Sequence, residues 1–139
     1  MSVYVDTSAL LAFLDSDDES HQSAVDALRS LRNSDENLVC SNYVLMETFA
    51  LLQHRLGLDA VRVFQRDLVA LVTVAWVDEA IHTRGVDAVL AANRRRLSLV
   101  DCTSFATMGR LGLRRVFTFD PHFAEQGFET VPAAAVGRR

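Results

Sequence analysis

The stretch "VFTFDPHF", residues 116–123, joins an apolar run to an aspartate, a proline and a histidine. The apolar run predicts a buried strand. The Asp-Pro pair is typical of a helix start, because aspartate caps helices and proline suits their first position. Asp120 therefore marks a junction between a strand and a helix. Whether it serves only as a cap, or also joins other carboxylates in a site, depends on the rest of the chain.

Short β-type runs alternate with segments of helical periodicity along the chain. The expected strands are SVYV (2–5), LVCS (38–41), VTVAWV (72–77), RVFTF (115–119) and FETV (128–131), with a polar tail over 132–139. The expected helices cover roughly residues 7–15, 17–37, 43–57, 58–70, 78–96 and 101–110. This alternation predicts βαβ units, and hence an α/β fold with a mainly parallel sheet covered on both faces.

Three aspartates occupy helix starts in this pattern. Asp6 and Asp120 each follow an expected strand, and Asp101 follows the apolar run LSLV. Each one alone is explained as a helix cap. In a parallel sheet, however, all strand-to-helix junctions fall on one edge, where ligands of α/β proteins bind. Capping itself therefore brings these carboxylates towards a common crevice.

Glu47 lies inside an expected helix and is harder to explain as structure. Val44 precedes it by three residues and Leu51 follows it by four, which places its side chain on an apolar stripe. A carboxylate that faces a core is costly unless it is paired or bound to a metal. A salt bridge to Arg55 or Arg29 would satisfy it, and so would a divalent cation shared with the aspartates.

Composition limits the classes of function. The chain has 139 residues, 50% hydrophobic and 23% charged, which predicts one globular domain over residues 1–139. All 14 basic residues are arginines, so no Schiff-base or P-loop lysine exists. The net charge of −4 gives no basic field for nucleic acid. Arginine clusters at 94–96 and 114–115 are either solvated surface or a rim that contacts phosphates.

The sequence also predicts a reducing cytoplasmic location. Cys40 and Cys102 form no disulfide framework or metal motif, which favours buried free thiols. The longest apolar runs are shorter than the roughly 20 residues that span a bilayer. The N-terminal MSVYVDTS has no basic region before an apolar stretch, so no signal peptide is expected.

Four segments together resemble a known family. They are VYVDTSALLAFLD (3–15), SNYVLMETFALL (41–52), LSLVDCTSFATM (97–108) and RVFTFDPHFAEQGFETVP (115–132). In this order, and in a chain of this size, they resemble the PIN-domain ribonucleases, most closely the VapC-type toxins of type II toxin–antitoxin pairs. The resemblance implies a three-layer α/β/α sandwich with a mainly parallel sheet of four or five strands.

The same resemblance implies an activity and partners. Members of this kind are endoribonucleases that depend on Mg²⁺ or Mn²⁺ and hydrolyse phosphodiester bonds in structured RNA such as tRNA or rRNA, leaving a 5′-phosphate and a 3′-hydroxyl. A cognate antitoxin protein holds the toxin inactive. We also expect a homodimer. The apolar helix pair over residues 49–64 would pack on the core, on a second copy or on the antitoxin.

The family's acidic positions transfer to this chain residue by residue. They match the predicted catalytic and metal-binding residues Asp6, Glu47, Asp101 and Asp120. Hydroxyl groups near them, expected to support the carboxylates or touch a phosphate, belong to Thr7, Ser8, Thr103 and Thr118. Asp6 and Asp101 would hold the principal ion, and Glu47 and Asp120 would complete its shell, bind a second ion or orient water. Hard oxygen ligands suit Mg²⁺ or Mn²⁺.

Two positions carry further expectations. Some relatives have an additional acidic residue beside the last aspartate, where this chain has Phe119 and Pro121. This leaves the ligands of a second ion open. His122 would suit a general base, but it is expected instead to fix the turn through local hydrogen bonds. Trp76 is expected to pack in the core or an interface, because its neighbours in the expected strand are apolar.

Three other classes of protein share parts of this pattern. Phosphoacceptor receiver domains also gather aspartates at strand ends, but they need a lysine that this chain lacks. Haloacid-dehalogenase-type phosphatases place a second aspartate two residues after the first, where Ser8 stands here. The remaining alternative is a catalytically silent PIN-like module that binds RNA or protein, which the four acidic residues disfavour.

Overall fold

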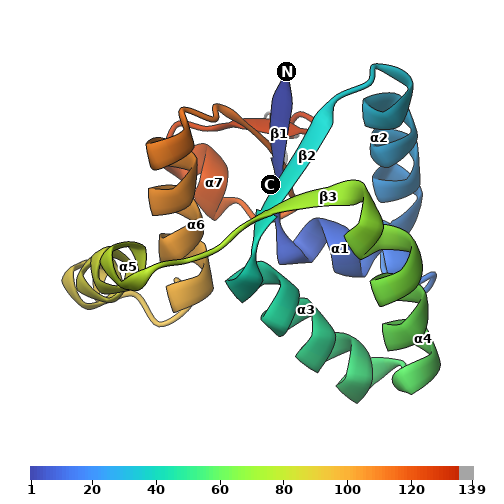
Figure 1. Ribbon diagram of the computed structural model, residues 1–139, viewed down its shortest axis with the longest axis horizontal. Coiled ribbons are helices and arrows are strands. Elements are labelled where there is room, and N and C mark those ends of the chain that lie inside the picture. The colour runs from blue at the N-terminus through green and yellow to red at the C-terminus, as the bar shows by residue number, and fades with distance from the viewer. Residues whose placement is uncertain (135–139) are drawn as a thin grey trace.

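A computed structural model describes residues 1–134. They contain one parallel five-stranded sheet with strand order β3-β2-β1-β4-β5 (Figure 1). The strands are β1 (Ser2–Val5), β2 (Asn37–Ser41), β3 (Val72–Ala75), β4 (Arg115–Phe117) and β5 (Glu129–Val131). The predicted α/β class and the parallel sheet are confirmed. The polar tail expected over 132–139 lies mostly outside the described residues.

Helices fill every connection between the strands. They are α1 (Thr7–Leu14), α2 (His21–Asn33), α3 (Asn42–Arg55), α4 (Leu58–Val63), α5 (Glu79–Ala92), α6 (Leu99–Leu111) and α7 (His122–Glu125). A π-helical turn (Phe64–Leu68) and a 3-10 turn (Val69–Leu71) continue α4 towards β3. The single helix expected over residues 58–70 is thus divided into an α-helical, a π-helical and a 3-10 part.

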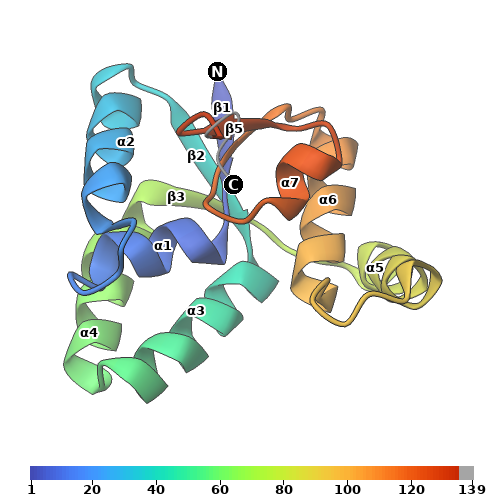
Figure 2. The same ribbon diagram turned by 180° about the vertical axis from the view of Figure 1, so that it is seen from behind.

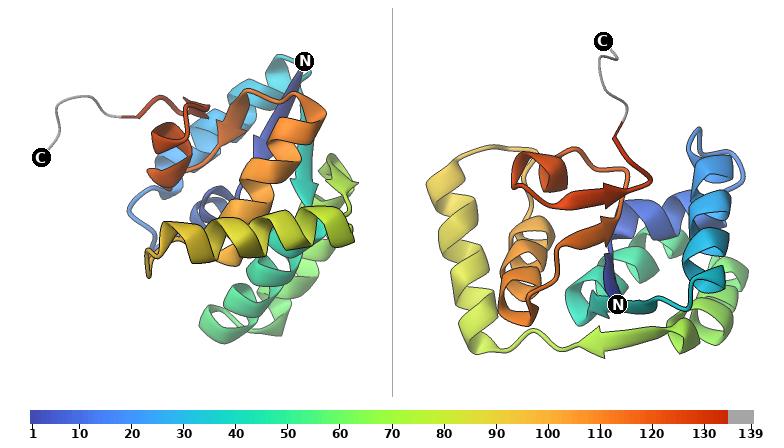
Figure 3. Two further views of the ribbon diagram at one scale, coloured as in Figure 1. Left: turned by 90° about the vertical axis from the view of Figure 1, so that its left-hand side faces the viewer. Right: turned by 90° about the horizontal axis from the view of Figure 1, so that it is seen from above.

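The sheet lies between two helical layers, as seen from above in Figure 3. Helices α5 and α6 lie on one side, and α1, α2 and α4 lie on the other. The central strand β1 is covered on both faces, so Val3, Tyr4 and Val5 are at most 1% exposed. Burial on two faces explains why this strand is continuously apolar rather than alternating. Its end delivers Asp6 to the carboxyl edge of the sheet.

The carboxyl edge is bordered by the beginnings of several helices. Figure 2 shows α1 starting at the end of β1 and α3 starting at the end of β2, with α6 and α7 on the opposite side. Helix α3 then leads away from the sheet beyond this edge (Figures 1 and 2). The edge therefore faces a region surrounded by elements from four separate parts of the chain.

Strand β3 ends earlier than the sequence pattern predicts. It stops at Ala75, and Trp76 follows it with 73% of its surface exposed. The core alternative for Trp76 is wrong, because the chain leaves the edge of the sheet before this residue, and packing in an interface stays a prediction. Outside the core, Leu90 and Met46 are also largely exposed on helices.

The helix pair expected to be apolar divides its residues between core and surface. Leu52 and Phe64 are buried, while Leu56 and Leu58 are exposed. Part of this segment therefore packs on the core, and part of it faces outward. None of the helices within residues 1–134 has the length and apolar character needed to cross a bilayer.

Helices α5 and α6 pack closely because of a glycine. A Cβ added at Gly85 would lie 2.4 Å from the methyl carbon of Thr103 and 3.2 Å from a methyl carbon of Leu99. Thr103 is held in place, since its hydroxyl donates to the carbonyls of Leu99 and Val100. The glycine that weakens α5 locally thus permits the close approach of α6, the helix that carries Asp101.

We predict that Gly85→Ala lowers the free energy of unfolding by about 1–3 kcal/mol, because overpacking outweighs the higher helix propensity of alanine. Gly109→Ala, within α6, is the matched control, since nothing lies within 4 Å of its added Cβ. That control should be neutral or stabilising by up to about 1 kcal/mol. Urea unfolding measures both, and Thr103→Ser should relieve part of the cost in Gly85→Ala. Equal effects of the two glycine substitutions would contradict the packing argument.

Candidate metal centre

Asp6 is the most buried carboxylate of the candidate site. It caps α1, and its side chain is held by three donors. Its Oδ2 accepts hydrogen bonds from Ser8 Oγ at 2.8 Å, Thr118 Oγ1 at 2.9 Å and the Ser8 backbone amide at 3.4 Å. Only 3% of the residue is exposed. The side chain is therefore fixed by its cap position and by residues from β1–α1 and the end of β4.

Asp101 reaches the same region from α6. The sequence pattern placed it at the start of a helix, but α6 begins two residues earlier, after the cap Ser98. Ser98 Oγ accepts from the Asp101 amide, and Asp101 Oδ2 accepts from the Ser98 amide at 3.0 Å. This reciprocal pair is a capping box, which holds the carboxylate at the N-terminal end of the helix. The expectation that Asp101 itself begins the helix is corrected.

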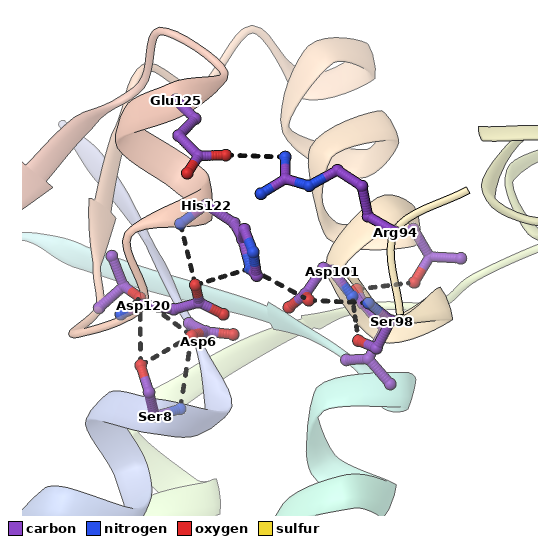
Figure 4. A network of polar contacts seen from close by, with 11 residues as sticks. Asp6, Ser8, Arg94, Ser98, Asp101, Asp120, His122 and Glu125 are labelled. Atoms are coloured by element: carbon purple, nitrogen blue, oxygen red, sulfur yellow. Dashed lines mark hydrogen bonds and ion pairs between the residues drawn. The ribbon is translucent and has the colours of Figure 1, made fainter. Parts of the chain in front are cut away.

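Asp120 follows β4 by three residues and precedes α7. Its amide donates to Thr118 Oγ1 at 2.9 Å, and its Oδ1 accepts from the His122 amide at 2.9 Å. Thr118 Oγ1 also lies 3.1 Å from Ser8 Oγ. Thr118 thus connects the turn that carries Asp120 with the carboxylate of Asp6. Figure 4 shows Asp6, Asp101 and Asp120 directed towards one region.

Glu47 approaches this group from the second turn of α3. It is half-buried, and the charges of Asp101 and Asp120 act on it. Thr7 Oγ1 is close enough to favour the ionised form of Glu47, yet it is buried without a hydrogen bond of ordinary geometry. The expected core-facing stripe is supported, because Val44 is fully buried. Asp6, Glu47, Asp101 and Asp120 thus converge from four elements.

The hydroxyl residues divide into two groups. Ser8 and Thr118 hydrogen-bond to Asp6, and Thr7 lies beside Glu47. Thr103 does not join them, because its hydroxyl donates to the backbone of α6 and its methyl packs against Gly85. We therefore assign Thr103 to helix packing, against the expectation of a role beside the carboxylates.

His122 belongs to the cluster although the sequence pattern assigned it only to the turn. Its Nδ1 lies 2.9 Å from Asp120 Oδ1 and 3.8 Å from Asp101 Oδ2. The expected local contact with Asp120 is present, and the contact across to α6 is additional. Its spacing in sequence gave no signal of this, because Asp101 is distant along the chain. Nearby, Arg94 Nη1 donates to Glu125 Oε1 at 2.9 Å (Figure 4).

Burial and mutual repulsion make the ionised carboxylates unfavourable. Burial is the main cause that raises the pKa of Asp6 from 3.8 to about 6; the charges of Asp101 and Asp120 contribute to this rise, and the hydrogen bonds from Ser8 and Thr118 act against it. Burial likewise raises the pKa of Asp101 and of Glu47, with Asp120 adding to both. The backbone hydrogen bond from Ser98 acts in the opposite direction on Asp101.

The donor set fits a divalent cation. Within residues 1–134, the ion pairs formed by arginines use other carboxylates, so Arg55 and Arg29 do not neutralise Glu47. Four carboxylates with one imidazole among them retain negative charge that a cation would balance. One ligand atom each from Asp101, Asp120 and His122 lies within 4.8 Å of the others. Oxygen ligands of this kind suit Mg²⁺ or Mn²⁺.

The chain is thus an α/β protein with a parallel sheet, and the carboxylates gathered at the carboxyl edge of that sheet form a site suited to a hard cation. The family model described as PIN domain matches residues 3–129. The chain belongs to the PIN-domain family, as the resemblance of its four acidic segments implied.

Two VapC proteins are similar to this chain over most of its length. The 23S rRNA-specific endonuclease VapC20 of Mycobacterium tuberculosis is 32% identical over 130 residues, covering 93% of this chain and 97% of that protein. A VapC ribonuclease of Aquifex aeolicus is 23% identical over 131 residues, covering 91% and 93%. The resemblance to VapC-type proteins is confirmed over nearly the whole chain.

Solved structures agree with the fold. The crystal structure of Mycobacterium tuberculosis VapC20, described as a sarcin–ricin loop cleaving toxin, superposes with a TM-score of 0.78, 32% identity and coverage of 91% of this chain and 96% of that one. FitAcB from Neisseria gonorrhoeae gives 0.69 at 17% identity, covering 92% and 95%, and supports the fold alone.

The raised pKa of Asp6 gives a testable stability profile in EDTA. The folded protein binds the Asp6 proton more tightly than the unfolded chain, so this group lowers stability as pH rises from about 4 to about 6. A shift from 3.8 to about 6 corresponds to a loss of about 3 kcal/mol above that window. We predict that Asp6→Asn raises the free energy of unfolding at pH 7 by up to this amount, as measured by urea unfolding.

The matched control for this prediction is Asp59→Asn, at the exposed first turn of α4. It should leave the pH profile between 4 and 6 unchanged. Mg²⁺ or Mn²⁺ should stabilise the wild-type protein and the control more than Asp6→Asn. If Asp6→Asn is instead less stable than the wild type at pH 7 in EDTA, the carboxylate stabilises the fold and the electrostatic account is wrong.

Proposed function

We propose that this protein is a divalent-cation-dependent endoribonuclease, the toxin component of a type II toxin–antitoxin pair. The observation that carries the proposal is the convergence of Asp6, Glu47, Asp101 and Asp120, which no arginine within residues 1–134 neutralises. Membership of the PIN-domain family and the names of the VapC relatives support hydrolysis of RNA.

Asp6 and Asp101 would hold the principal cation, Mg²⁺ or Mn²⁺, and Glu47 and Asp120 would complete its surroundings or orient the attacking water. When bound, the cation lowers the pKa of a water molecule and offsets negative charge at the phosphate. The chain's own contribution is to fix the carboxylates before RNA arrives. Hydrolysis by water needs no covalent nucleophile, and the expected products carry a 5′-phosphate and a 3′-hydroxyl.

The hydroxyl groups of Ser8 and Thr118 hold Asp6 in one orientation. They donate to the same oxygen, Oδ2, at 2.8 and 2.9 Å. Because they occupy this oxygen, the other oxygen of Asp6 is the one presented to a cation. The Ser8 hydroxyl also accepts from the Phe119 amide at 2.9 Å, so the α1 start and the Asp120 turn are joined directly. Such a network supplies the rigid positioning that hydrolysis requires.

The proposed substrate is structured RNA. The relative VapC20 is named for cleavage of 23S rRNA and of the sarcin–ricin loop, which makes that stem–loop the first RNA to test. Arginines 94–96 lie two residues or more before Ser98, the cap of the helix that carries Asp101. Arg94 is paired with Glu125, whereas Arg95 and Arg96 are exposed and take part in no ion pair within residues 1–134. These two are suited to contact phosphates beside the cleavage site.

A cognate antitoxin and a second copy of the chain are the proposed protein partners. The exposed apolar side chains of Trp76, Leu90, Met46 and Leu58 provide surface for such contacts.

The first test measures cleavage of a sarcin–ricin stem–loop and of tRNA by the purified protein in Mg²⁺, Mn²⁺ or EDTA. We predict cleavage with either cation, and a loss of about 100-fold or more in Asp6→Asn and Asp101→Asn, in line with the removal of a group that stabilises the transition state. Asp59→Asn is the control for preparation and for contaminating nuclease.

Because Asp101 also closes the capping box of α6, circular dichroism must show that Asp101→Asn is folded. Cleavage that persists equally in both active-site variants would contradict the proposal. RNA binding without cleavage, unchanged by both substitutions, would favour a module that binds RNA and does not cut it.

The second test concerns Arg95 and Arg96. We predict that Arg95→Ala and Arg96→Ala each weaken RNA binding at low salt and reduce the slope of log K against log[salt] by about 1 for duplex contacts. Arg29→Ala, on an exposed face of α2, should leave that slope unchanged. Binding to catalytically impaired Asp6→Asn protein, measured by fluorescence anisotropy, separates this effect from cleavage. Unchanged slopes in both variants would show that these arginines are ordinary surface.

A further inference from the structure

The imidazole of His122 stands between two carboxylates from different parts of the chain. Its Nδ1 lies 2.9 Å from Asp120 Oδ1 and 3.8 Å from Asp101 Oδ2, and its side chain is only 13% exposed (Figure 4). Nδ1 is buried, yet it has no hydrogen bond of ordinary geometry, even to the oxygen at 2.9 Å. The ring nitrogen is thus close to both carboxylates without being aligned on either as a donor.

These separations match those of atoms that share one ion. Ligands at about 2.1 Å from a cation in octahedral geometry lie about 3 Å apart when adjacent and about 4 Å apart when opposite. The distance of 2.9 Å is close to the adjacent separation, and the distance of 3.8 Å lies between the two. The three ligand atoms from Asp101, Asp120 and His122 all lie within 4.8 Å of one another. A cation would therefore fit among them with small movements of the side chains.

A plain ion pair is the alternative explanation for this contact. An imidazolium would neutralise part of the charge of Asp101 and Asp120, and it would then be displaced when a cation binds. A direct pair at 2.9 Å is expected to align its N–H with the carboxylate oxygen. Nδ1 lacks that alignment in the structure. This favours the other explanation, in which the nitrogen and the carboxylate oxygens face a shared cation.

We propose that His122 is itself a cation ligand, through Nδ1, in a mixed nitrogen and oxygen site with Asp120 and Asp101. This inference rests on the proposed function. It supplies the ligand that the side chains of Phe119 and Pro121, on either side of Asp120, do not offer. Because imidazole suits transition metals better than Mg²⁺, the site prefers Mn²⁺ to Mg²⁺.

The test is binding of Mn²⁺ to the full chain, followed by electron spin-echo envelope modulation and by competition with Mg²⁺. The wild-type protein should show coupling of bound Mn²⁺ to a directly ligated ¹⁴N nucleus. His122→Phe should lose that coupling and bind Mn²⁺ about tenfold or more weakly, since loss even of a residue that only orients a metal ligand costs this much. His122→Asp should lose the coupling and shift the preference towards Mg²⁺.

His54→Gln is the matched control, because this histidine is exposed near the end of α3. It should retain both the coupling and the Mn²⁺ affinity. Circular dichroism checks that each variant is folded, and His122→Gln replaces His122→Phe if the phenylalanine variant is not.

The possible results separate this inference from the proposed function. Mn²⁺ that binds without ¹⁴N coupling, or with coupling that persists in His122→Phe, overturns the role of His122 and leaves the carboxylate site standing. No binding of Mn²⁺ or Mg²⁺ at millimolar concentration overturns both. Loss of coupling in both His122 variants, with retention in His54→Gln, supports the inference.

Discussion

The carboxyl edge of this sheet brings together partly buried carboxylates whose negative charges repel one another. The effect is sharpest at Asp6, where burial, together with the charges of Asp101 and Asp120, raises the pKa to about 6. Proteins neutralise such charges, pair them or bind cations with them. Pairing by arginine does not occur here within residues 1–134, although the chain is rich in arginine. The fold thus holds carboxylates together although they repel one another, and a bound cation would reduce this repulsion.

Helix starts lower that cost and fix the geometry. Asp6 caps α1, and Asp101 occupies the first turn of α6 within its capping box. Negative groups at these positions are favoured by the helix dipole and by free amides. The same local bonds that begin each helix therefore orient its carboxylate. Close packing of α6 on α5, made possible by Gly85, places the second of these helix starts against the sheet edge.

The sequence predicted most of this arrangement for a physical reason. Parallel strands and helices alternate, so residues at strand ends such as Asp6 and Asp120 must meet, and the apolar stripe on α3 located Glu47. The start of α6 was harder to predict, because Ser98 and Asp101 both favour a helix start. Only their mutual hydrogen bonds decide which one is the cap. Trp76 was misplaced because apolar neighbours do not reveal where an edge strand ends.

His122 illustrates the limit of local patterns most clearly. Histidine after Asp-Pro is sufficiently explained by the turn, and its amide does hydrogen-bond to Asp120. The contact that gives it chemical significance is with Asp101, which another helix brings across the carboxyl edge. No spacing in the sequence encodes that distance, since it depends on how α6 and α7 pack beside β4. The structure identifies it instead by a buried Nδ1 that lies near two carboxylates without an aligned hydrogen bond.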